Sequence, residues 1–218
     1  MKLTINDKEV LRFLGYRGAE ADERISPLVN EMIELFSANL VPKSVYGIWD
    51  CKTDSSALSV GGISVRSKNL CEHLKNCRHA VLLAATLGPQ ADTLIRRFSV
   101  QDMEKAVVAQ AVCAAIIEVY CDEITCKMEN EFAQNKELCG LHPVSRFSPG
   151  YGDFDIAYQK DILNLLNCRR IGLTLTDGNM LVPSKSVTAV IGFSREKGQT
   201  AGKCESCAAA SCELREAV

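Results

Sequence analysis

A loop in the second half of the chain holds residue types that could bind a small charged molecule. It runs from Arg146 through Phe-Ser-Pro-Gly to Tyr151. An arginine can bind a carboxylate through two parallel hydrogen bonds, and Tyr151 offers a stacking face with a hydroxyl. Pro149 stiffens the turn and Gly150 lets a ligand approach the backbone, so amides exposed here could hold a carboxylate or an adenine edge.

Two acidic groups bear on the role of this arginine. In one interpretation Arg146 only stabilises a rigid turn, by pairing with a local aspartate such as Asp153 or Asp155. Glu118 is the one formal charge within residues 106–121. At about 100° per residue it lies roughly 60° from the centre of the apolar stripe. Its simplest interpretation is a flanking glutamate that reaches solvent or a nearby Lys or Arg.

The chain has 11 cysteines, and three of them gather near its end, Cys204, Cys207 and Cys212. Thiolates at this spacing can hold a zinc ion or an iron–sulfur cluster that takes a further ligand from elsewhere. A CxxC pair can equally act as a dithiol redox unit, and a tail without function is the third alternative. If the tail folds back, the fourth ligand could be Cys51, Cys139 or Cys168.

Other familiar chemical patterns are missing from the sequence. It has no GxSxG, HExxH, GxxxxGK[ST] or GxGxxG motif. No pair of histidines has metal-ligand spacing, so we expect surface or capping roles for His73, His79 and His142.

Length and composition limit the class of protein. With 218 residues the chain fits one ordinary domain, residues 1–197, followed by a Cys-rich tail, residues 198–218. A net charge of -2 without any basic run argues against binding to nucleic acid or a membrane surface. No apolar stretch has the length of a membrane span or of a signal peptide, so we expect a cytoplasmic protein whose thiols stay reduced.

Hydrophobic periodicity predicts the elements that position these residues. Helices are expected as a pair within residues 8–36 and at 66–74, 88–98, 100–132 and 153–168. Strands are expected at 43–51, 57–65 and 80–87, and a hairpin joins 171–176 to 180–194 through a turn at 177–179. Because hairpin strands are antiparallel, the sheet should not be wholly parallel.

Two of these helices have an apolar stripe that predicts which residues face the core. In the long helix the stripe comprises Met103, Val107, Ala111, Ala114, Ile117, Cys121, Ile124, Met128 and Phe132. Its cysteines, Cys113, Cys121 and Cys126, are best explained as core fillers. In the following helix the inward residues should be Ile156, Ile162, Leu163, Leu165 and Leu166.

Two sequence blocks carry a resemblance to a known family. The loop RFSPGY resembles the RxxPGY segment of the S-adenosylmethionine-binding activation domain of cobalamin-dependent methionine synthase. Downstream, IGLTLTDGNMLVPSKSV is similar to that domain's IGxxLT, six residues, then PxxSV, without a gap. The likeness covers roughly residues 118–193. The shorter segments TLGP at 86–89 and LRFLGYRG at 11–18 are similar to free-standing relatives of the domain.

The resemblance implies a fold and a site. The fold would be α+β, with a bent, mainly antiparallel sheet and surrounding helices. Arg146 and the backbone around Ser148, Pro149 and Gly150 would bind the methionine carboxylate and the adenosine, with Tyr151 beside them. Glu118 would be the helix carboxylate that faces the ligand's ammonium group.

The resemblance also implies a task. The family's domain presents S-adenosylmethionine for reductive methylation of an inactive cobalamin. This chain lacks the DxHxxG cobalamin-ligand pattern, so it would be an accessory component that acts on cobalamin held by a separate methionine synthase. A flavodoxin-like or ferredoxin-like protein would supply the electron. Two alternatives stay open: an iron–sulfur or thiol redox activator of another corrinoid-dependent methyltransferase, and a non-catalytic protein that binds an adenosyl metabolite.

Overall fold

The computed structural model describes residues 5–16 and 24–196 of the chain. Within these ranges the helices are α1 (Asp7–Phe13), α2 (Ile25–Asn39), α3 (Lys68–His73), α4 (Pro89–Gln101), α5 (Met103–Ala133) and α6 (Gln159–Leu165), with 3-10 turns at Ile156–Tyr158 and Cys168–Ile171. The strands are β1 (Lys43–Thr53), β2 (Ala57–Val60), β3 (Ile63–Arg66), β4 (His79–Thr86), β5 (His142–Pro143), β6 (Thr174–Leu175), β7 (Leu181–Val182) and β8 (Ser186–Ser194).

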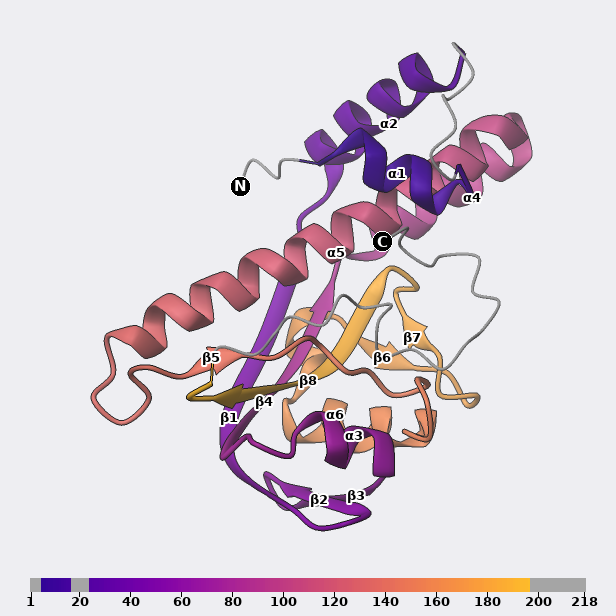
Figure 1. Cartoon of the computed structure of the whole chain (residues 1–218). Helices are drawn as coiled ribbons and strands as arrows, with labels where there is room; N and C mark the ends of the chain where they lie inside the picture. Colours follow the sequence, from indigo (N-terminus) through magenta and orange to yellow (C-terminus); the bar gives the residue numbers. More distant parts are fainter. Residues whose placement is uncertain (1–4, 17–23, 197–218) are drawn as a thin grey trace.

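Six of these strands form one antiparallel sheet in the order β3-β2-β1-β4-β8-β5, while β6 and β7 form a separate small hairpin. β1 pairs with β4 along Lys43 to Asp50, but with β2 only through its last three residues. The β2–β3 hairpin therefore attaches at the end of β1, and Figure 1 shows it turned away from the direction of β1, β4 and β8. The predicted α+β class with an antiparallel sheet is confirmed.

Helices cover both faces of the sheet. On one face, α5 crosses the strands and α1, α2 and α4 surround its first half (Figure 1). On the other face, α3 and α6 pack on the same strands. β4 shows the alternation that this requires, because Val81, Leu83 and Ala85 face the first core while Ala80, Leu82 and Ala84 face the second.

The long helix begins and packs differently from the prediction. Residues 100 and 101 belong to α4, and Asp102 caps the N-terminus of α5 by accepting a hydrogen bond from the amide of Lys105. Met103 and Val107 are 66% and 54% exposed, contrary to the expected stripe. The first turns of α5 pack against α4, so the buried positions there are Ala106, Val108, Ala109 and Val112. From Ala111 onward the predicted stripe is buried, with Ala114 half-buried. Cys113 and Cys121 fill the core, but Cys126 is exposed.

Three other predicted elements are shorter than expected. Residues 57–65 form two strands because the chain turns at Gly61 and Gly62, both with positive φ. The helix expected over 153–168 is reduced to α6 between two 3-10 turns, since Asn167 adopts a left-handed conformation. Leu165, predicted to point inward, is 37% exposed. The hairpin turning at 177–179 is confirmed, although β7 and β8 are separate strands.

Candidate functional site

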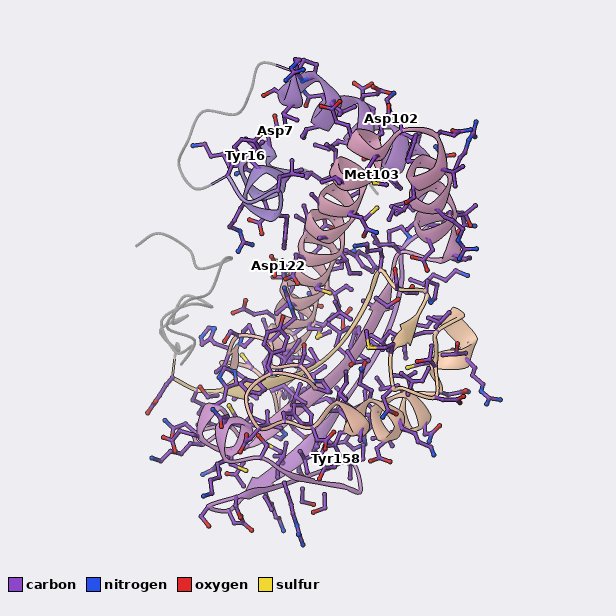
Figure 2. All side chains as sticks on the ribbon, turned by 90° about the vertical axis from the view of Figure 1, so that its right-hand side faces the viewer. Asp7, Tyr16, Asp102, Met103, Asp122 and Tyr158 are labelled. Atoms are coloured by element: carbon purple, nitrogen blue, oxygen red, sulfur yellow. The ribbon has the colours of Figure 1, made fainter. Side chains whose placement is uncertain are left out.

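Arg146 is held by two carboxylates of α5. Its Nη2 donates to Oε2 of Glu118 at 2.8 Å, and its Nη1 donates to Oδ1 of Asp122 at 2.5 Å. Because Glu118 and Asp122 are four residues apart, both side chains lie on the same face of the helix. Figure 2 shows Asp122 partway along α5, between Met103 at the start of the helix and Tyr158 at the opposite end of the molecule. We call Arg146, Glu118 and Asp122 the Arg146 cluster.

The loop is fixed so that Arg146 reaches α5. Phe147 forms an antiparallel bridge with Val190 of β8, through two backbone hydrogen bonds of 3.0 and 2.8 Å. One residue before the arginine, the carbonyl oxygen of Ser145 lies 2.7 Å from Nε2 of His73 at the end of α3. The arginine is therefore placed between two anchored neighbours, one held by the sheet and one by a helix of the opposite layer.

Burial and charge act against each other on the guanidinium. The Arg146 side chain is only 10% exposed, and this burial lowers its pKa. At the high pH where an arginine would titrate, the acidic groups Cys121, Asp122 and Glu118 are ionised and outweigh the burial, so the pKa of Arg146 is raised above its ordinary value. The arginine stays charged, and its charge is met by more than one negative group.

The RFSPGY loop is ordered by its own hydrogen bonds. The amide of Gly150 donates to the carbonyl of Phe154 at 2.7 Å, and the amide of Tyr151 donates to the carbonyl of Ser148 at 3.2 Å. Gly150 has φ of 96°, a conformation that an L side chain rarely adopts. The prediction of a structured loop is confirmed. However, the amides of Gly150 and Tyr151 are engaged inside the loop, and a ligand would have to find other donors.

The remaining predicted ligand residues lie around this turn rather than on the Arg146 cluster. Pro149 is buried, Ser148 is half-buried and Tyr151 is 69% exposed. An open hollow of about 470 Å³ lies against the turn, lined by Gly150, Gly152, Asp153, Phe154, Asp155 and Ile156. The structure thus brings Arg146 and Glu118 into direct contact. It leaves the Tyr151 ring exposed on the turn.

The local aspartates considered as partners of Arg146 have other roles. Asp153 accepts hydrogen bonds from the Ser67 hydroxyl and from the amides of Lys68 and Asn69, so it holds the N-terminus of α3. Asp155 caps the 3-10 turn that follows the loop. The expectation that Arg146 pairs with either of them was wrong. The partner that sequence reasoning missed is Asp122, whose only signal is its position four residues after Glu118.

No metal-binding group was found in the part of the chain that the structure describes. Among residues 5–16 and 24–196 there is no cluster of three His, Cys, Asp or Glu side chains that could hold an ion. His73, His79 and His142 each have a hydrogen-bonding or ionic partner and lie apart. Cys51 and Cys168 are buried and Cys139 is exposed. The predicted ligands Cys204, Cys207 and Cys212 lie outside the described residues.

Comparison with known proteins identifies the fold. The structure resembles the crystal structure of the MetH reactivation domain bound to AdoHcy, with a TM-score of 0.68 and 17% sequence identity, over 89% of this chain and 75% of that one. No family model and no curated protein matches the sequence. At this level of identity the likeness defines the fold class, a helix-covered antiparallel sheet of the MetH reactivation type. Within the described residues, no helix is long and apolar enough to cross a membrane.

Proposed function

We propose that this protein binds an S-adenosyl ligand, S-adenosylmethionine in the first place, through the Arg146 cluster and the RFSPGY loop. The observation that carries the proposal is the contact of Arg146 with Glu118 in a fold whose structural neighbour was crystallised with AdoHcy. A guanidinium and a carboxylate side by side suit the amino-acid end of such a ligand, which carries a carboxylate and an ammonium group.

The donor set supports particular roles for these residues. Arg146 would take the ligand carboxylate and Glu118 the ammonium group. Tyr151, exposed at the rim of the loop, would stack on the adenine. Ser148, Pro149 and Gly150 would shape the turn, contributing carbonyl oxygens or the Ser148 hydroxyl rather than the two amides that are already used.

The ligand would serve the reactivation of a cobalamin cofactor. We propose an accessory role in reductive methylation of the cobalamin of a separate methionine synthase or another corrinoid protein, with a flavodoxin-like or ferredoxin-like electron donor. The basis is the fold, which resembles that of the MetH reactivation domain. The cobalamin would be held by the partner, and residues 1–197 would act as the activation domain.

The spacing of Cys204, Cys207 and Cys212 supports a second candidate role for the tail, residues 198–218. Three thiolates at this spacing suit zinc or an iron–sulfur cluster. A cluster there would make the protein a redox activator of another corrinoid-dependent methyltransferase. Visible absorption of protein purified without oxygen separates the two roles, because a cluster absorbs there and zinc or free thiols do not.

The binding proposal is tested by calorimetric titration with S-adenosylmethionine and, in parallel, S-adenosylhomocysteine. We expect saturable binding that Arg146→Ala weakens by about 2 kcal/mol, or roughly 30-fold, the loss of one charge-assisted contact. Arg96→Ala, which removes an exposed arginine of α4, is the control and should leave the affinity unchanged. Absence of binding by the unaltered protein at millimolar ligand would contradict the proposal.

A further inference from the structure

The Arg146 cluster carries more negative than positive charge. One guanidinium contacts two carboxylates, Glu118 on Nη2 and Asp122 on Nη1. The three side chains sum to a charge of -1. A third carboxylate arriving at the same guanidinium would meet repulsion from both acidic groups, unless one of them moves away.

The two carboxylates differ in how easily they can leave. The side chain of Asp122 is 64% exposed, whereas that of Glu118 is 30% exposed and that of Arg146 only 10%. An exposed carboxylate exchanges an ion pair for water at little cost, since surface ion pairs contribute about 1 kcal/mol or less. Asp122 is therefore the partner that can release Arg146, and the buried guanidinium is the partner that stays in place.

We propose that Asp122 competes with the carboxylate of the ligand for Nη1 of Arg146, and so sets the affinity of the site for ligands that carry a carboxylate. This inference rests on the proposed binding of an adenosyl amino acid. On binding, the ligand carboxylate replaces Asp122 on Nη1, while Glu118 keeps its contact with Nη2 and faces the ammonium group.

The exchange improves the charge balance around the guanidinium. With Asp122 moved into solvent, Arg146 and Glu118 contribute +1 and -1, and the amino-acid end of the ligand contributes a carboxylate and an ammonium group. The pairing is then neutral, whereas the cluster with Asp122 in place carries -1. A ligand without a carboxylate has nothing to place on Nη1 and leaves Asp122 where it is.

The test compares two ligands that differ in one group, S-adenosylmethionine and its decarboxylated form. Calorimetry measures both dissociation constants for the unaltered protein and for Asp122→Asn. We expect the substitution to tighten binding of S-adenosylmethionine by about fivefold, the equivalent of one surface ion pair. Binding of the decarboxylated ligand should not tighten. The dissociation constant of the decarboxylated ligand divided by that of S-adenosylmethionine should therefore rise by about the same factor.

Asp161→Asn provides the matched control, because Asp161 is an exposed aspartate on α6, which covers the opposite face of the sheet. It removes the same charge and should leave the ratio unchanged. Equal thermal unfolding temperatures for both variants would exclude a folding defect.

Three results would overturn the inference. An unchanged ratio would mean that Asp122 and the ligand do not share Arg146. Weaker binding of S-adenosylmethionine by Asp122→Asn would mean that Asp122 positions the arginine or attracts the sulfonium. Failure of the unaltered protein to bind either ligand would remove the proposed function itself, and with it this inference.

Discussion

At the scale of single residues, the chemistry of the site depends on which groups remain charged and reachable. Arg146 stays protonated because two carboxylates compensate its burial. For the buried thiols the balance is the opposite, since desolvation by burial is the largest effect on their pKa and disfavours the thiolate. Burial raises the pKa of Cys51, Cys77 and Cys168 to about 11 and that of Cys113 to about 12.

These shifts predict that the cysteines of the described residues differ in how fast they react with an alkylating reagent. At pH 8, iodoacetamide should modify the exposed Cys126 and Cys139 quickly. For Cys51, Cys77, Cys113 and Cys168, whose pKa values are about 11 or 12, the ionised fraction at this pH is about one in a thousand or lower. These four thiols should remain unmodified in the folded protein. Peptide mass spectrometry after a timed reaction measures this, with a urea-unfolded sample as control. Fast modification of Cys113 in the folded protein would contradict the burial described for it.

The candidate site could be predicted in part from its residue types. Arg146 and Glu118 could be named because an arginine in a glycine-proline loop and a lone acid on an apolar helix stand out in the sequence. Asp122 lies four residues after Glu118 and therefore on the same helix face, but the sequence does not show where along that face the loop brings Arg146. That depends on the bridge between Phe147 and Val190, which joins segments more than 40 residues apart.

At the scale of elements, close contact between β8 and the segment that follows α3 leaves no room for a side chain at Gly192. A Cβ atom there would lie 2.4 Å from Sγ of Cys77 and 2.5 Å from Cδ2 of Leu74. Gly192→Ala should therefore lower the free energy of unfolding by about 1–3 kcal/mol, a typical effect of overpacking. Urea unfolding followed by circular dichroism measures it.

Gly178 offers a control for the same substitution. Its Cβ would meet only Oγ1 of Thr176, at 3.9 Å, so Gly178→Ala should change the stability by less than about 0.5 kcal/mol. Equal effects at the two glycines would show that the packing of β8 against Leu74 and Cys77 is looser than described.

The N-terminus of α3 depends on the carboxylate of Asp153, two residues after the RFSPGY loop. Hydrogen bonds from the Ser67 hydroxyl and from the amides of Lys68 and Asn69 lower the pKa of Asp153. A lowered pKa in the folded state means that Asp153 stabilises the fold above the ordinary carboxyl pKa of 3.8, and that this contribution disappears as the pH falls through the lowered value.

Asp153→Asn should accordingly lower the thermal unfolding temperature at pH 7. The difference from the unaltered protein should shrink as the pH falls below the ordinary carboxyl pKa of 3.8 and through the lowered pKa of Asp153. Scanning calorimetry at several pH values tests this, with Asp161→Asn as the matched control. If the difference in unfolding temperature were as large at the lowest pH as at pH 7, the effect would come from the geometry of the side chain and not from its charge.

Element types were more predictable than element ends. The periodicity of α5 and the Gly-Pro start of α4 are local signals, and both helices were expected. The exposure of Met103 and Val107 has a tertiary cause, because the helices α1, α2 and α4, rather than the sheet, pack against the first half of α5. Periodicity alone does not contain that information.

At the scale of the whole molecule, the ligand site and the Cys-rich tail are separate in the proposed function. Replacing Cys204 and Cys207 together by serine should change the affinity for S-adenosylmethionine by less than about twofold, as expected for independent sites. Calorimetry with the full-length chain checks this. A joint loss of affinity and of any bound metal would show that tail and loop form one site.

The order of strands in the sheet also affects how the chain folds. The central strand β4 is almost wholly apolar and pairs on one side with β8, so that Thr86 meets Ser186, 100 residues later. Closing so long a loop costs conformational entropy, and folds dominated by distant contacts form slowly. During synthesis the edge of β4 that pairs with β8 therefore stays unpaired until β8 (Ser186–Ser194) has been made. The helix α5, which precedes β8 in the chain, can cover the face of β4 formed by Val81, Leu83 and Ala85 before that edge is paired.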